Sequence, residues 1–151
     1  YPFISQLLEK NPNIIFDIYG YKNRQPIWSE EFYNTIQLSK MGLNLSRTNS
    51  VKYYTSNRVS SLIGNGLMTF VDIKTQLNDF FSDDEVIFYK NVEDLSEKLN
   101  YFKENNQLRK KIAENGQKKY FKFFNSELIV KYIIHKTFDI KSKNKFYWED
   151  K

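Results

Sequence analysis

A polar helix start that contains one arginine is the stretch of this sequence best suited to chemistry. Directly before Arg58 stand three residue types that favour the first position of a helix: Thr55, Ser56 and Asn57. Open N–H groups at a helix start attract anions, and a guanidinium offers a rigid fork of donors that fits phosphate oxygens. We therefore predict an anion site at Arg58. The alternatives are a surface arginine or an internal ion pair, with Ser56 and Asn57 serving only as caps.

The residues after Arg58 predict a short helix, a turn and a buried strand. Val59, Leu62 and Ile63 have the three- and four-residue spacing of one buried helix face. Gly66 follows at a helix stop, where glycine tolerates a left-handed backbone. Residues 67–71 form a short apolar run, as expected of a strand covered on both faces. A polar helix start beside buried parallel strands is where α/β folds bind ligands.

Strands and helices alternate along the rest of the chain. Apolar runs predict strands over residues 14–19, 41–45, 67–71 and 85–89. Apolar spacing predicts helices over residues 1–10, 30–39 and 74–81, one that Asn91 caps, and two more over 107–124 and 126–137. This alternation indicates an α/β fold, a Rossmann-like parallel sheet with helices on both faces.

Two further candidates lie where predicted strands end. Asn44, followed by Ser46, ends the second strand, at the ligand-facing edge of such a sheet. Gly20 ends the first strand, where it allows either a close approach of a ligand to the backbone or a simple turn.

Composition limits the chemistry. The 151 residues are 40% hydrophobic and 27% charged, which is typical of one globular domain. The absence of cysteine and the presence of one histidine exclude disulfides, thiolates and multi-histidine metal sites, so we expect neither a metal nor a cofactor. The net charge of +5 suits a nucleotide diphosphate, a membrane surface or nucleic acid, and a lysine-rich surface that only aids solubility is the alternative.

A basic run is the second candidate for binding. It occupies one helical segment with aromatic residues between its members, and it consists of Arg109, Lys110, Lys111, Lys118, Lys119 and Lys122. Such a run could contact anionic lipid or nucleic acid, or it could be the solvated face of an amphipathic helix.

The stretch SNRVSSLIGNGLMTFVD resembles the donor-binding half of group 1 glycosyltransferases, which have the GT-B fold. It is most similar to the spore-maturation-like and lipopolysaccharide-type branch, which shares a serine–x–arginine helix start, a small-x-glycine turn and a strand ending in aspartate. The resemblance extends over about residues 13–138 and ends with LRKKIAENGQKKYFKFF.

The resemblance implies a nucleotide-sugar-binding domain over residues 1–138, incomplete at its N-terminus, followed by a tail over 139–151. Its substrate would be a nucleotide diphosphate sugar, from which a hexosyltransferase of cell-envelope glycan synthesis transfers sugar to a glycan or lipid-linked acceptor. A preceding acceptor domain would be missing, so this chain alone would be inactive. The expected location is the cytoplasm, with peripheral contact to the inner face of the membrane and no nucleic acid partner. The donor-binding residues would be Gly20, Asn44, Ser56, Asn57, Arg58 and Gly66, with no catalytic residue assigned.

One departure from the family weakens the match. Many relatives carry two glutamates separated by seven residues, the second of which binds the ribose, and here Tyr53 and Ser61 occupy those positions. Their absence leaves the ribose contact and the nucleotide unspecified, and it would also fit a degenerate, non-catalytic domain. The alternative function, which rests on the positive charge and the aromatic residues, is a non-enzymatic basic module that binds nucleic acid or a membrane surface.

The resemblance also implies a strand order. It would run 41–45, 14–19, a vacant central place, 67–71 and 85–89, with a preceding strand of a longer chain filling the gap.

Overall fold

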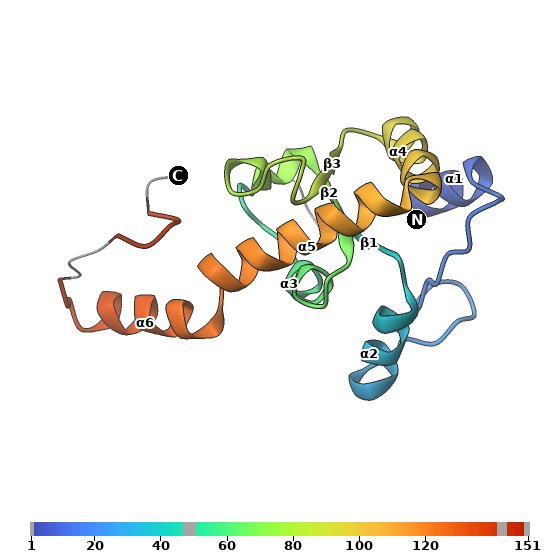
Figure 1. The fold of residues 1–151 in the computed structure, drawn as a ribbon. Helices are drawn as coiled ribbons and strands as arrows, with labels where there is room; N and C mark the ends of the chain where they lie inside the picture. The colour runs from blue at the N-terminus through green and yellow to red at the C-terminus, as the bar shows by residue number, and fades with distance from the viewer. Residues whose placement is uncertain (1, 47–50, 142–144, 150–151) are drawn as a thin grey trace.

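A three-stranded parallel sheet forms the centre of the molecule. The computed structural model describes residues 2–46, 51–141 and 145–149. The strands lie in the order β1 (Met41–Asn44), β2 (Met68–Asp72) and β3 (Ile87–Tyr89), and α3 (Asn57–Gly64) connects the first two (Figure 1). The predicted α/β class with a Rossmann-like parallel sheet is confirmed.

The helices begin and end close to where the sequence predicts them. They are α1 (Pro2–Lys10), α2 (Ser29–Leu38), α4 (Val92–Glu104), α5 (Asn106–Phe123) and α6 (Ser126–Thr137). The Asn91 side chain accepts a hydrogen bond from the Asp94 amide at 2.9 Å, so the predicted cap of α4 is present. Asn125 caps α6 in the same way, through the amide of Leu128 at 3.0 Å.

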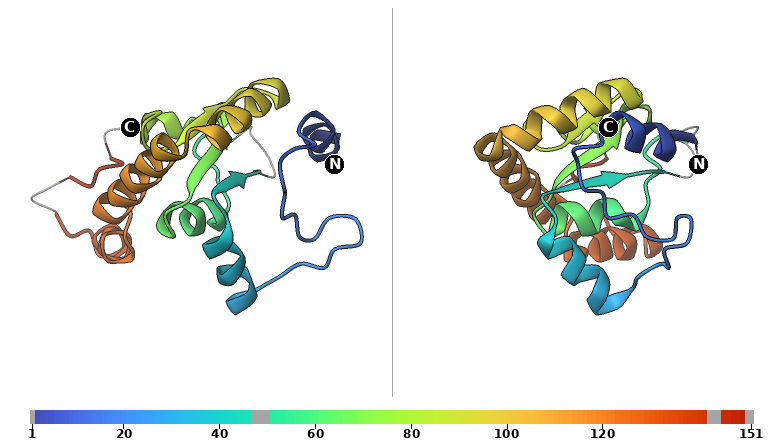
Figure 2. Two further views of the ribbon diagram at one scale, coloured as in Figure 1. Left: turned by 45° about the vertical axis from the view of Figure 1, so that its right-hand side comes forward. Right: turned by 90° about the vertical axis from the view of Figure 1, so that its right-hand side faces the viewer.

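Helices cover both faces of the sheet, as predicted. On one face Phe70 and Tyr89 pack against α1, α4 and the first half of α5. On the other face Val71 and Phe88 pack against α3 and the second half of α5. Figure 2 shows α1 and α4 on one side of β1 and α3 on the other.

The predicted strand over residues 14–19 is wrong. The segment is extended but pairs with no described strand, and Ile15 is 93% exposed. Ile14 and Phe16 instead rest their side chains on the core. A β-prone run becomes a strand only where it meets a partner edge, because β-propensity depends on context.

The predicted strand order is therefore also wrong. β1 pairs directly with β2, with Met41 opposite Met68 and Asn44 opposite Val71, which leaves no vacant place between them. Consecutive parallel strands joined by one crossover helix usually become neighbours, and β1, α3 and β2 form such a unit.

The predicted helix over residues 74–81 is replaced by two 3-10 turns. These are η1 (Ile73–Thr75) and η2 (Leu77–Asp79). Gln76 separates them in a left-handed conformation, with φ of 59°, so a continuous α-helix cannot form.

α5 closes the amino-terminal edge of the sheet. It contacts the segment that leads into each strand. Arg109 Nη1 donates to the Lys40 carbonyl at 2.8 Å, and Gln117 Nε2 donates to the Gly64 carbonyl at 2.9 Å. At β3, Lys119 Nζ lies 2.7 Å from a Glu85 carboxylate oxygen. Ligands bind at the carboxyl-terminal edge of such sheets, where β1 ends beside the start of α3.

Two members of the basic run, Arg109 and Lys119, are engaged by these contacts within the fold. Arg109 is buried, and burial lowers the pKa of its guanidinium. Burial opposes the charge on Lys119, but its hydrogen bond with Glu85 raises the pKa of the ammonium overall. Both side chains therefore hold the fold together and are not available to a partner.

The described part of the tail, residues 145–149, docks on the body. Phe146 is buried, and the Tyr147 hydroxyl donates to the Phe80 carbonyl at 3.1 Å. Trp148 stacks on Phe124, with ring centres 5.9 Å apart. These aromatic contacts hold the segment against the body.

Replacing Gly66 by valine is expected to destabilise the fold by about 1–2 kcal/mol, because a β-branched residue is strained in a left-handed conformation. Gly66 has φ of 76°, and an added Cβ would lie 3.3 Å from the Gln117 amide nitrogen. The measurement is thermal unfolding, with Gly66→Asn as the control that tolerates this backbone. An unchanged melting temperature for Gly66→Val would show that this turn is ordinary.

Candidate functional site

A buried asparagine organises the carboxyl-terminal end of β1. Asn44 is 1% exposed, and its carboxamide oxygen accepts a hydrogen bond from Ser56 Oγ at 2.9 Å. Its nitrogen donates to Ser46 Oγ at 3.3 Å. Three polar residues that the sequence placed at this edge are thus joined, and they fix the start of α3 against the end of β1.

The start of α3 is open. Ser56 stands at the N-cap, but its hydroxyl points to Asn44 and caps no N–H of the helix. Within the described residues, the amides of Asn57 and Arg58 meet no hydrogen-bond acceptor. This leaves the positive end of a helix dipole exposed beside the sheet edge.

The guanidinium of Arg58 lies at the same place. Its Nη1 donates to the Leu45 carbonyl at 3.3 Å, which holds the side chain over the end of β1. Arg58 is exposed and forms no ion pair with a carboxylate in the part of the chain that the structure describes. Its remaining donors are therefore available to an anion.

Asp72 also lies at this edge, although it was not among the donor-binding residues predicted from the sequence. It ends β2, and its carboxylate accepts the Lys74 amide at 2.9 Å. Burial, together with the nearby Asp72 charge, raises the pKa of the Tyr89 phenol, which stays neutral at physiological pH. The position of Asp72 at the end of a predicted strand is the sequence signal that could have identified it as a site residue.

Two predicted site residues lie elsewhere. Gly66 precedes β2, at the amino-terminal edge, so the length of α3 separates it from Arg58. Gly20 adopts φ of 70° in a tight turn, where its amide donates to the Arg24 carbonyl at 3.0 Å and Pro26 lies close by. The structure thus brings together Asn44, Ser56, Asn57 and Arg58, and it does not bring Gly20 or Gly66 to them.

The positions of the absent glutamates carry structural contacts. The Tyr53 hydroxyl donates to Asp79 at 2.6 Å, and its ring packs against Phe80 with centres 4.7 Å apart. Ser61 Oγ donates to the Asn57 carbonyl within α3. Neither residue supplies a carboxylate for a ribose.

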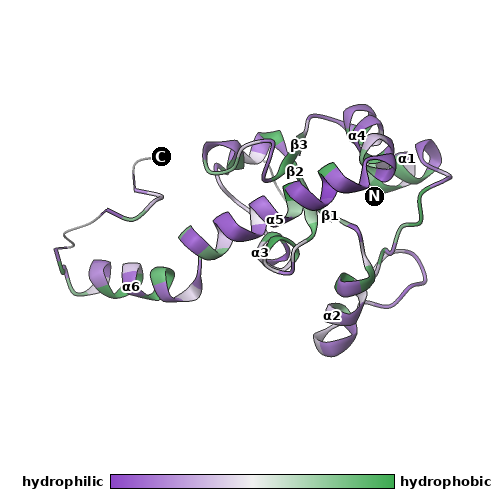
Figure 3. Cartoon of the chain, viewed as in Figure 1, coloured by the Kyte–Doolittle hydropathy of each residue, from purple (hydrophilic) through white to green (hydrophobic). Residues whose placement is uncertain are grey.

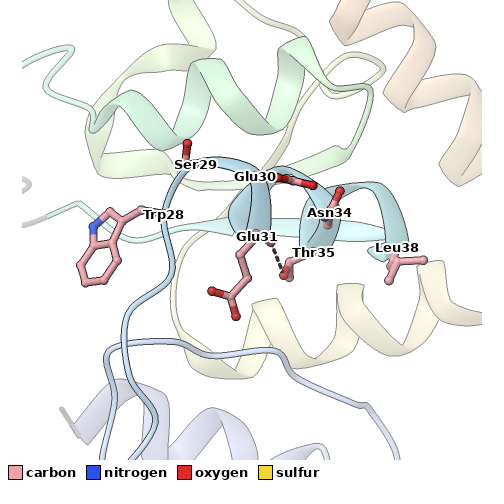
Figure 4. Close-up of a pocket in the computed structure, with 7 residues that line it drawn as sticks. All are labelled: Trp28, Ser29, Glu30, Glu31, Asn34, Thr35 and Leu38. Carbon is pink, nitrogen blue, oxygen red and sulfur yellow. Dashed lines mark hydrogen bonds between the residues drawn. The ribbon is translucent and has the colours of Figure 1, made fainter.

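Two surface hollows lie away from the Arg58 cluster. One is lined by α2 and the residue before it, between Trp28 and Leu38 (Figure 4). The Leu38 side chain at the end of α2 is 87% exposed. A smaller hollow lies at the amino-terminal edge, between Gly66 and α5. Neither hollow is lined by a residue of the Arg58 cluster.

Comparison with known families agrees with the fold. The model of the glycosyl transferase-like family matches residues 2–135. The match covers most of the chain, which therefore belongs to the glycosyl transferase-like family. No curated protein matches the sequence. Membership supports a role in glycosyl transfer and leaves the donor and acceptor to be established.

Proposed function

We propose that this chain binds the nucleotide diphosphate sugar donor of a GT-B glycosyltransferase at the Arg58 cluster, Asn44, Ser56, Asn57 and Arg58. The observation that carries the proposal is the juxtaposition of an uncapped helix start and an arginine that pairs with no carboxylate among the described residues, at the carboxyl-terminal edge of a parallel sheet. A diphosphate matches both features, because it accepts several hydrogen bonds and carries negative charge.

The same arrangement would assist bond cleavage. When the bond between sugar and diphosphate breaks, negative charge grows on the leaving diphosphate. Donors that are already in place stabilise that charge more strongly in the transition state than in the bound substrate. Arg58 and the amides of Asn57 and Arg58 are suited to this role.

In this proposal the sugar passes to a glycan or lipid-linked acceptor that a separate domain binds, in the cytoplasm. The chain alone should therefore bind donor without transferring sugar. Membership of the family and the lack of carboxylates at Tyr53 and Ser61 together favour donor binding with a ribose contact unlike that of the relatives.

Calorimetric titration tests the proposal. We expect nucleoside diphosphates and nucleotide sugars to bind the 151-residue chain, and the matching nucleosides to bind far more weakly, because the charged hydrogen bonds to the diphosphate contribute most of the affinity. Equal affinity for nucleosides and nucleoside diphosphates would contradict a diphosphate site.

A further inference from the structure

The last helix, α6, is apolar on two sides, and the described residues cover one of them. Tyr132 and His135 face the docked tail, where each ring lies against Phe146 at 5.2 and 5.7 Å. The other side carries exposed aliphatic residues, Ile129, Val130, Ile133 and Ile134, with Phe138 and Ile140 just beyond the helix. Ile133 is 55% exposed and Phe138 is 72% exposed.

These four aliphatic residues share one helix face. At 3.6 residues per turn, Ile129, Val130, Ile133 and Ile134 lie within a single sector. Lys136, which pairs with Glu149 at 3.0 Å, borders this sector on one side, and Glu127 followed by Lys131 borders it on the other. We call this sector and its two lysines the α6 face. α6 lies at the end of the molecule away from α1, beyond the sheet, and Figure 3 shows apolar residues along it.

The positive charge of the chain gathers in the same region. Residues 106–141 contain nine basic and three acidic residues, whereas the other 115 residues contain fourteen basic and fifteen acidic ones. Seven of the nine are exposed: Lys110, Lys111, Lys118, Lys122, Lys131, Lys136 and Lys141. The net charge of the whole protein therefore comes from α5, α6 and the segment that follows them.

We propose that the α6 face docks on an anionic lipid bilayer, with α6 lying in the plane of the interface. An apolar helix face bordered by lysines is the arrangement that amphipathic surface helices use, with the aliphatic side chains among the acyl chains and the ammonium groups at the headgroups. In the described part of the chain no helix has the length and apolar character to cross a membrane. Binding at the surface therefore rests on these side chains and on the surrounding charge.

Vesicle flotation with the 151-residue chain tests this proposal. We expect binding to vesicles that contain phosphatidylglycerol, and at least about tenfold weaker binding to pure phosphatidylcholine, because several lysines lie near the surface. Ile133→Asp should weaken binding to the anionic vesicles at least about tenfold. Leu38→Asp is the matched control, since it changes an equally exposed aliphatic residue on α2 and should leave binding unchanged.

A charge variant separates headgroup attraction from apolar insertion. Lys131→Ala should weaken binding to anionic vesicles about fivefold, whereas Lys103→Ala on α4 should have no effect. Absence of binding to anionic vesicles would overturn the proposal. Equal loss of vesicle binding for Ile133→Asp and Leu38→Asp would also overturn it. A dimer in sedimentation that Ile133→Asp dissociates would overturn it as well, because the α6 face would then bind a second copy of the chain.

Discussion

Gly116→Ala is expected to destabilise the protein by about 2–3 kcal/mol, although alanine normally stabilises a helix relative to glycine. Gly116 lies within α5, where the helix passes Glu85, just ahead of β3. An added Cβ would collide with the backbone carbonyl oxygen of Glu85. A backbone atom cannot rotate away as a side chain can, so α5 must move off the sheet edge.

That movement would cost several contacts together. The hydrogen bond from Asn115 to the Asp84 carbonyl and the ion pair of Lys119 with Glu85 both depend on the close approach at Gly116. The measurement is thermal unfolding, with an expected fall in melting temperature of about 5–10 °C.

Gly64→Ala is the matched control for this substitution. Gly64 also stands in a helix, but an added Cβ would meet the Tyr120 ring at an ordinary 3.6 Å. We expect Gly64→Ala to leave stability unchanged or slightly raised. Equal melting temperatures for Gly116→Ala and Gly64→Ala would contradict the contact between α5 and the start of β3.

Arg58→Ala is expected to weaken binding of a nucleoside diphosphate by about 1.5–3 kcal/mol, the range for charged hydrogen bonds, which corresponds to about 10- to 150-fold in Kd. The stability of the fold should hardly change, because the side chain is exposed and makes one hydrogen bond to the Leu45 carbonyl. Calorimetry on the variant and the parent measures the difference.

Arg24→Ala controls for the loss of charge alone. Arg24 is an exposed arginine that pairs with Asp17 on the turn before α2, so its removal changes the net charge by the same amount. We expect its affinity to match the parent. Arg58→Lys should bind with intermediate affinity, because it keeps the charge and loses the planar fork. Equal weakening by Arg24→Ala and Arg58→Ala would show a diffuse charge effect and no site at Arg58.

Local signals in the sequence predicted most of the secondary structure. Helix spacing and caps located α3, α4 and α6 to within a few residues, because periodicity and capping are properties of short segments. The strand predicted over residues 14–19 was wrong because a strand requires a partner edge, and a local sequence pattern does not show whether such an edge is present. The strand order failed for the same reason, since the pairing of β1 with β2 is decided between segments.

The candidate site was predictable in part. The sequence placed Asn44, Ser56 and Arg58 at one edge from their positions after a strand and at a helix start, and the structure joins them. It could not show that the Ser56 hydroxyl would turn to Asn44 and leave the helix uncapped, because that depends on which group lies opposite. Arg109 looked like surface charge for a similar reason, since its buried carbonyl partner is distant in sequence.

The most direct test of donor binding is NMR mapping of the bound nucleotide. With backbone amides assigned, a nucleoside diphosphate should shift the signals of Asn44, Ser56, Asn57 and Arg58, at the carboxyl-terminal edge of the sheet. The competing interpretation places the ligand on the exposed lysines of α5, Lys110, Lys111, Lys118 and Lys122. Shifts confined to the Arg58 cluster are the predicted result, and shifts confined to α5 would contradict a donor site at Arg58.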